Sequence, residues 1–279
     1  MTRLKKTVLL ALLCAVGPLN AQTVVIDSLI APSLGRMQHV TVLLPRGFDT
    51  TRTYAGLILL HGFGGDHRNW TALTHLADDL GSRPLVILMP DGDNSWYVNS
   101  VTDPANRYED DLASDVVTYG TRRYHLDTTR LAIGGLSMGG YGALVAGLRH
   151  PDRFRFVIAL SSSLDVPRGI PDLEQEGRAG LRPSLVAALG ADSSAAWKSY
   201  DILRLVAHAD PARTPYVYLA TGISDEFAKR LSLHRALADS LRAHQISYEY
   251  HETPGRHNWE YWDREIGPAL ERLQDVLGF

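Results

Sequence analysis

Gly134-Gly135-Leu136-Ser137-Met138-Gly139-Gly140 holds the pattern Gly-x-Ser-x-Gly, and the architecture expected for this chain follows from it. An apolar, partly β-branched run at 129–133 precedes it and predicts a buried strand. Residues 141–149 carry alanine and leucine at helical spacing and predict a helix that ends before Pro151. A strand and a helix joined in this way form a nucleophile elbow, whose serine projects from a sharp turn. Glycines 135 and 139 are expected because the neighbouring backbones leave no room for a Cβ, and the helix start aims its amides at a developing anion.

The composition of the chain limits its class. The 279 residues are 45% hydrophobic and 21% charged, with a formal net charge of −3. This suits one large α/β domain or two small ones, with ample length for a core. The near-neutral balance provides neither a basic surface nor an acidic tail, so a nucleic-acid partner is not expected.

The N-terminus has the pattern of a secretory signal peptide. Three basic residues in the first six precede an apolar run at 8–16, and cleavage is expected after Ala21. The run is too short for a permanent membrane span, so export to the periplasm or medium is expected. A lipoprotein anchored through Cys14 is less favoured, because Leu13 stands where a small residue is expected; a frayed helix of a cytosolic protein is the other alternative. Cys14 is the only cysteine, which excludes thiol catalysis and a cysteine-based zinc site in the mature chain.

Strand and helix patterns alternate through the rest of the chain. Strands are expected at 23–29, 38–44, 55–60, 85–89, 129–133, 154–160, 216–221 and 246–252, and helices at 69–80, 108–124, 141–149, 226–244 and 259–277. The alternation predicts a mostly parallel sheet with helices on both faces. Proline and glycine interrupt the segment at about 164–213, which is interpreted as a small irregular cap insertion. Residues 22–279 are therefore expected to form a single domain.

Five polar or charged residues lie in loops that directly follow predicted strands: His61, Asp91, Ser137, Asp225 and His257. The carboxyl ends of parallel strands meet at one edge of a sheet, where ligands bind. These loops are therefore expected to converge on one site. His61 is expected to hold its own loop and not to act as a ligand.

A serine nucleophile needs a general base, and the base needs an acid that fixes its tautomer. His257 is the preferred base because it lies in the glycine-containing loop between the last strand and the last helix. His251, in the last strand, is the alternative. The histidines predicted to lie within helices, His75, His234 and His244, are expected to be packed or solvated.

Asp225 is the preferred acid, since it follows one strand and precedes a helix. The same position also suits a helix cap, which would need no partner. Glu226 is the nearest substitute, although a charge in the first turn is its simpler interpretation. The order Ser137, Asp225, His257 favours the catalytic reading, because nucleophile-elbow enzymes of the α/β-hydrolase fold have their triads in this order.

The anion that forms during acyl transfer is expected to bind two backbone amides. One belongs to Met138, and the other to the glycine-rich loop after the third strand, where Phe63 is favoured and Gly64 is the alternative. Trp96 and Tyr97 follow the fourth strand. They are expected either to line the substrate pocket or to pack their loop onto the sheet, and both interpretations stay open.

Several short motifs together resemble a known family. They are residues 60–65 with Trp70, 90–92 with 95–97, 135–143, 222–225 and 254–262. In these motifs the chain resembles the esterase D, or tributyrin esterase-like, branch of α/β-hydrolases, whose relatives include feruloyl and acetylxylan esterases, S-formylglutathione hydrolases and mycolyltransferases. The resemblance covers nearly all of 38–275. It implies the α/β-hydrolase fold and ester hydrolysis through an acyl-enzyme, with Ser137, Asp225 and His257 as triad and with no cofactor or metal.

We therefore expect a secreted serine carboxylesterase that acts on short-acyl or carbohydrate-linked esters of the acetyl or feruloyl type. The cap segment at 164–213 matches the family least, and substrate preference in such families is often set there. S-formylglutathione hydrolysis is less favoured because it is a cytosolic task. Acyl transfer to a sugar or another alcohol is an alternative, and a non-catalytic binding protein with this fold is a further one. The expected partner is an ester substrate, without nucleic acid or a stable membrane anchor.

Overall fold

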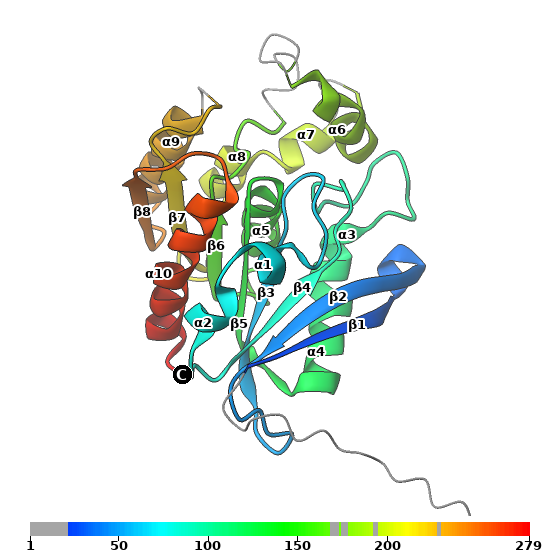
Figure 1. The fold of residues 1–279 in the computed structure, drawn as a ribbon. Coiled ribbons are helices and arrows are strands. Elements are labelled where there is room, and N and C mark those ends of the chain that lie inside the picture. The colour runs from blue at the N-terminus through cyan, green and yellow to red at the C-terminus, as the bar shows by residue number, and fades with distance from the viewer. Residues whose placement is uncertain (1–21, 168–172, 174–177, 192–194, 228–229) are drawn as a thin grey trace, which may run out of the picture.

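One sheet, of eight strands in the part of the chain that is described, frames the molecule (Figure 1). The computed structural model describes residues 22–167, 173, 178–191, 195–227 and 230–279, so the predicted signal peptide at 1–21 lies outside it. The strands are β1 (Thr23–Ala31), β2 (Arg36–Leu44), β3 (Tyr54–Leu60), β4 (Leu85–Pro90), β5 (Leu126–Leu136), β6 (Phe156–Leu160), β7 (Tyr216–Gly222) and β8 (Tyr248–Thr253). Their spatial order is β1-β2-β4-β3-β5-β6-β7-β8.

The sheet is mostly parallel, as the sequence predicts. Only the first two contacts in that order, β1 with β2 and β2 with β4, are antiparallel. The six strands from β4 to β8 run parallel to their neighbours, so their carboxyl ends point to the same edge. In Figure 1 this edge is the upper one. The loops that follow β3, β4, β5, β7 and β8 therefore meet there.

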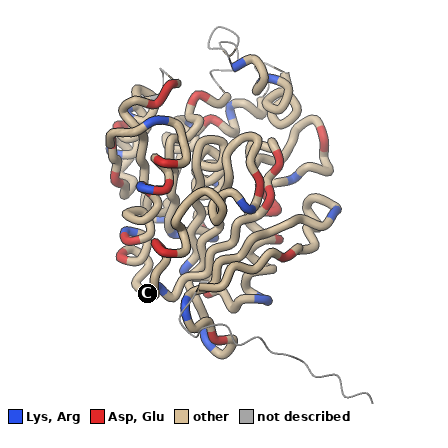
Figure 2. Tube along the Cα trace, viewed as in Figure 1, with Lys and Arg blue, Asp and Glu red and all other residues tan. Residues whose placement is uncertain are grey.

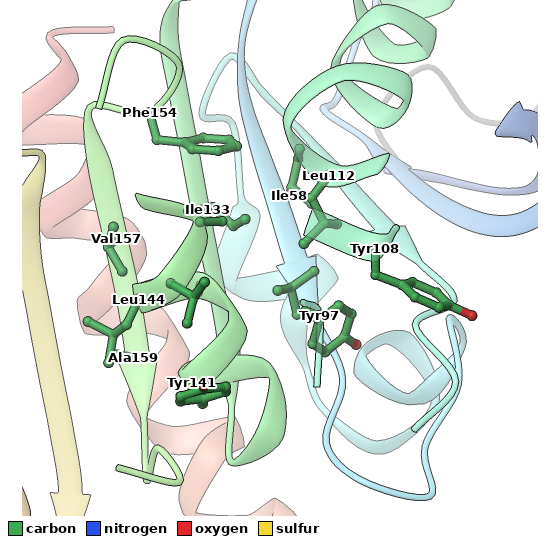
Figure 3. Packing of buried hydrophobic residues seen from close by; sticks show 14 of the residues in the cluster. Ile58, Tyr97, Tyr108, Leu112, Ile133, Tyr141, Leu144, Phe154, Val157 and Ala159 are labelled. Carbon is green, nitrogen blue, oxygen red and sulfur yellow. The ribbon is translucent and has the colours of Figure 1, made fainter. Parts of the chain in front are cut away.

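Helices cover both faces of the sheet and form two separate buried layers. Alternate residues of β3 serve the two layers: Ile58 and Leu60 face one, and Leu57 and Leu59 face the other. The first layer packs against α4 (Val117–Tyr124), α5 (Met138–Arg149) and α9 (Arg230–Ala243), and Figure 3 shows part of it around Ile58. The second packs against α1 (Asn69–Leu73), α2 (Leu76–Leu80) and α10 (Trp259–Leu277). Continuous apolar runs become central strands because both of their faces are buried.

Two of the expected helices are divided. The helix predicted at 69–80 breaks at Thr74, whose backbone is extended (φ −140°, ψ 169°). The Thr74 hydroxyl donates to Trp70 O and accepts from Leu76 N, so it ends α1 and supports the start of α2. The helix predicted at 108–124 consists of α3 (Tyr108–Asp110), a π-helical turn (Asp111–Val116) and α4.

The described residues of the predicted cap segment contain short helices and no strand. They are η4 (Ala179–Leu181), α6 (Arg182–Leu189), α7 (Ala195–Ser199) and α8 (Ile202–Ala207). Figure 1 shows α6 and α7 above the carboxyl edge of the sheet, whereas α8 packs against α5 and α9. Residues 168–172, 174–177 and 192–194 of this segment lie outside the described part.

A buried carboxylate joins the cap to the body of the domain. Glu109 accepts hydrogen bonds from Arg149 Nε, His150 Nε2 and the Tyr200 hydroxyl, at 2.7, 2.8 and 2.8 Å. Burial alone would raise the pKa of Glu109, but these donors lower it below its usual value. The Tyr141 hydroxyl of α5 in turn donates to Tyr200 O at 2.9 Å. Such a paired buried charge fixes the position of the cap because breaking it would leave the carboxylate unsatisfied.

Neither charge sign is confined to one part of the fold in the view of Figure 2. Figure 2 shows basic and acidic residues interspersed along the loops and helices in this view. Within the described residues, no helix is both long enough and apolar enough to cross a membrane.

Candidate active site

The predicted nucleophile elbow is present between β5 and α5. Ser137 has φ 51° and ψ −114°, a strained conformation for any residue other than glycine. The turn allows no side chain at its two glycines: a Cβ on Gly139 would lie 2.6 Å from Leu60 O, and one on Gly135 would lie 2.6 Å from Gly139 C. The strain is supported by the two rigid elements that the turn connects.

The structure brings the three predicted triad residues together from three separate loops. Ser137 Oγ lies 3.0 Å from His257 Nε2, and His257 Nδ1 lies 2.9 Å from Asp225 Oδ2. The Asp225 side chain is 2% exposed and that of His257 is 12% exposed. Because a carboxylate only accepts hydrogen bonds, Asp225 holds the proton on Nδ1 and leaves Nε2 to accept the serine proton. This is the arrangement that activates a serine.

The alternative base and acid lie elsewhere. His251 Nε2 is 3.2 Å from Glu249 Oε2 within β8, and its ring packs on Tyr218. Glu226 contacts the backbone of the histidine loop and not the imidazole: its Oε2 accepts from His257 N at 3.0 Å, and its Oε1 lies 3.0 Å from Arg256 Nη2. The His257 N–H is the main reason that the pKa of Glu226 is lowered. Sequence reasoning missed this role of Glu226.

Aromatic rings clamp the imidazole on two sides. The ring centroids of Phe227 and Trp262 lie 4.8 and 5.0 Å from that of His257, with interplanar angles of 84° and 89°. The Arg178 guanidinium lies over Phe227, at 4.9 Å, and is paired with Asp165. Neither Phe227 nor Arg178 was a sequence candidate. The only signal for Phe227 was its place two residues after the predicted acid.

Beside Ser137, the backbone amides of Phe63 and Met138 have no acceptor among the described residues. The alternative donor, Gly64 N, is already engaged by Asn94 Oδ1 at 2.7 Å. The loop passes directly beside the nucleophile, since a Cβ on Gly62 would lie 3.6 Å from Ser137 Cβ. This geometry favours Phe63 over Gly64 as the second donor.

His61 holds this loop to the next one, as expected. The Gly92 N–H donates to His61 Nε2 at 2.9 Å, so the ring proton is on Nδ1 and is directed at Gly62 O, 2.8 Å away. The ring is 1% exposed. Its two hydrogen bonds therefore tie the loop after β3 to the loop after β4.

A cavity of about 590 Å³ opens beside Ser137, and six of its sixteen lining residues carry aromatic rings. Trp96 lines it and donates to Ser184 Oγ of α6 at 3.0 Å. Tyr97 does not line it, so the expectation of a pocket role is wrong for this residue. Its side chain is fully buried against α5, where it donates to His61 O at 3.2 Å (Figure 3). The other ring-bearing wall residues are Phe63, Phe227, His257, Trp259 and Trp262.

Within the described ranges, no group of three or more histidine, cysteine or acidic side chains is arranged to hold a metal ion.

Comparisons with known proteins agree with this geometry. A model of the Esterase family matches residues 31–273. The acetyl esterase of Caldicellulosiruptor saccharolyticus is 27% identical over 230 residues, which cover 79% of this chain and 83% of that protein. The diacylglycerol acyltransferase/mycolyltransferase Ag85B of Mycobacterium avium is 24% identical over 284 residues, 91% of this chain and 84% of the relative. A solved structure of FphF, a fluorophosphonate-binding serine hydrolase of Staphylococcus aureus, has a TM-score of 0.77 at 24% identity and covers 91% of this chain and 98% of that one. The fold is thus that of the α/β-hydrolases, and the chain belongs to the esterase family of serine hydrolases that act on carboxylic esters.

Proposed function

We propose that the protein hydrolyses esters of short acyl groups, or of acyl groups carried by carbohydrates, through an acyl-enzyme on Ser137. One observation carries the proposal: Ser137, His257 and Asp225 are joined by two hydrogen bonds, of 3.0 and 2.9 Å, and the serine and the histidine line one cavity. A structural role would not require a strained serine beside an oriented imidazole.

The reaction has two halves in this geometry. Ser137 Oγ attacks the ester carbonyl while His257 Nε2 takes its proton, and Asp225 stabilises the imidazolium that results. The Phe63 and Met138 amides hold the oxyanion of the tetrahedral intermediate. The imidazolium then gives its proton to the leaving alcohol. In the second half His257 takes a proton from water while the water oxygen attacks the acyl-enzyme. The imidazolium returns this proton to Ser137 Oγ when the acyl–oxygen bond breaks and the carboxylic acid leaves.

The choice of substrate class has two supports. An acetyl esterase is among the relatives, at 27% identity. The cavity of about 590 Å³ is open to solvent at one side, which suits a small acyl group with an alcohol that extends outward. Its aromatic walls offer flat surfaces on which apolar acyl groups or the apolar face of a sugar can pack.

The test is hydrolysis of short-chain nitrophenyl esters by a Ser137→Ala variant. We expect kcat to fall by at least about 1,000-fold, since the triad acts as a unit. His251→Ala is the matched control, because it removes a histidine that lies outside the triad, and it should retain wild-type turnover. Retained hydrolysis by purified Ser137→Ala would remove Ser137 from its role.

Acyl transfer to an alcohol is a second candidate, favoured by the acyltransferase among the relatives. Both activities share the acyl-enzyme and differ in whether water or an alcohol attacks it. Products formed from nitrophenyl acetate with and without a sugar acceptor distinguish them. An acetylated sugar at the expense of acetate would identify a transferase.

We also propose that residues 1–21 export the protein and are removed after Ala21. The basic start, the short apolar run and the small Ala21 before Gln22 support this. N-terminal sequencing of protein from the periplasm or medium should begin at Gln22; an intact Met1 on cytosolic protein would refute it.

A further inference from the structure

The strand at the open end of the sheet is unusually apolar on its exposed face. Val24, Ile26 and Ile30 of β1 are 47%, 65% and 73% exposed, and Met37, the β2 partner of Ile30, is 55% exposed. They share one face because side chains alternate along a strand. The opposite face of β1 packs on α4, as the 2.7 Å hydrogen bond from Tyr119 to Asp27 shows.

The edge itself is available for pairing. No described strand pairs with the outer side of β1, which is nine residues long. One outward amide, Ser28 N, is held by the neighbouring Asp27 Oδ1 at 2.8 Å. Long apolar edges template pairing with another chain unless charged residues or proline protect them.

The other end of the sheet has such protection. On β8, Glu249 pairs with Arg272 at 2.6 Å and Glu252 with Arg235 at 2.6 Å. On β1 the only charged residue is Asp27, which faces α4. β8 therefore carries charged residues that oppose pairing with another chain, whereas the exposed face of β1 carries none.

A groove of about 520 Å³ runs between β1 and the helical segment formed by α4 and the π-helical turn before it. Its helical wall carries Asp115 at one end and Arg122 and Arg123 at the other. Asp115 accepts from Ser33 N at 2.8 Å, just beyond the end of β1, whereas Tyr119, in the middle of the wall, bonds Asp27. The wall thus has a negative end beside the end of β1 and a positive end beside its start.

We propose that this surface binds a second copy of the same chain, with the two β1 strands antiparallel about a two-fold axis at Ser28. In this register Ile26 of each copy faces the partner's Ile30, so the most exposed apolar side chains cover one another. The register one step away would set the two Asp27 side chains opposite each other. The Ser28 N–H exchanges its bond to Asp27 for one across the new edge.

The charges on the helical wall fit the same symmetry. A two-fold axis at Ser28 reverses the direction of the wall in the second copy, so the Asp115 end of each copy meets the Arg122 end of the other. The charges of two such walls therefore attract each other when the two copies are antiparallel. In a parallel arrangement, like charges would meet instead.

Two double variants with charges at positions 26 and 30 test the register, and light scattering measures the molar mass of the full chain in solution. The wild type is expected to have the mass of a dimer. Ile26→Glu with Ile30→Glu should give single chains, because like charges face each other, whereas Ile26→Lys with Ile30→Glu should remain paired because opposite charges do. Ester hydrolysis per chain should be unchanged in both variants. A single-chain wild type, or a paired Glu/Glu variant, would overturn the proposal.

A cross-link locates the axis. In a Cys14→Ser background the chain has no other cysteine, and Ser28→Cys should form a disulfide-linked pair on oxidation, since opposed residues of antiparallel strands lie about 5.5 Å apart between Cα atoms. Met37→Cys, exposed but one strand further in, is the matched control and should stay single. Equal cross-linking at both positions, or none at Ser28, would refute this interface.

Discussion

Asn94 offers a direct test of how the anion-binding loop is held. Its side-chain oxygen accepts the Gly64 N–H at 2.7 Å, next to the Phe63 amide that we assign to the oxyanion. Asn94→Ala removes this acceptor without touching Ser137 or His257. Asn94→Asp keeps an acceptor at the same position.

The size of the effect follows from the bond that is lost. A neutral hydrogen bond contributes about 1 kcal/mol to stability. Its loss would therefore change the equilibrium between the observed loop conformation and other conformations about fivefold. Complete loss of one oxyanion donor would reduce kcat by about 100-fold or more. We therefore expect Asn94→Ala to reduce kcat about fivefold and to change KM by less than about twofold, because the amide acts mainly in the transition state.

Initial rates with nitrophenyl acetate measure this, and the affinity of a trifluoromethyl ketone transition-state analogue should fall by a similar factor. Asn106→Ala is the matched control, because Asn106 bonds Asp103 at 2.6 Å and is outside the loop. Wild-type kcat in Asn94→Ala would refute the reasoning. So would an Asn94→Asp variant as slow as the alanine variant, since its acceptor is intact.

Three further predictions concern other sites. Gly142→Ala should lower the free energy of unfolding by about 1–3 kcal/mol in urea titrations, because the new Cβ would lie 2.5 Å from Tyr97 Cβ; an unchanged midpoint would contradict the packing. Glu226→Ala should lower kcat/KM about fivefold while Glu226→Gln largely retains it, since the side chain accepts from His257 N; equal losses in steady-state kinetics would exclude this role. Burial raises the pKa of Asp111 to about 7, above its unfolded value of about 4, so the folded state holds this proton more tightly and stability should fall as pH rises from about 4 to 7. Asp111→Asn should reduce this part of the pH dependence, and an unchanged stability profile would count against it.

The fold and the three central residues could be predicted because each has a local signal. Gly-x-Ser-x-Gly demands a strand-turn-helix, and the structure shows the close contacts that exclude a Cβ at Gly135 and Gly139. Asp225 and His257 stand at strand ends, where topology alone brings them to one edge. Their meeting within hydrogen-bond distance follows from the parallel sheet.

The supporting residues could not be predicted in this way. Asn94 acts on Gly64 and Glu226 on His257 across 30 and 31 residues of sequence, and side-chain–backbone bonds of that span leave no periodic pattern. Tyr97 was ambiguous because the same aromatic side chain suits a pocket and a core. The space beside Gly142 of α5 is filled by Tyr97, which decides for the core, and only tertiary packing creates that space.

A row of rings runs from Phe227 past the catalytic histidine to α1. After Phe227, His257 and Trp262, the contacts continue to Trp259 at 5.2 Å and from there to Trp70 at 5.5 Å. Indole emission responds to a charge that appears on a neighbouring imidazole. Trp262, whose ring centroid lies 5.0 Å from that of His257, is therefore placed to act as an internal optical reporter of a change of charge on this imidazole.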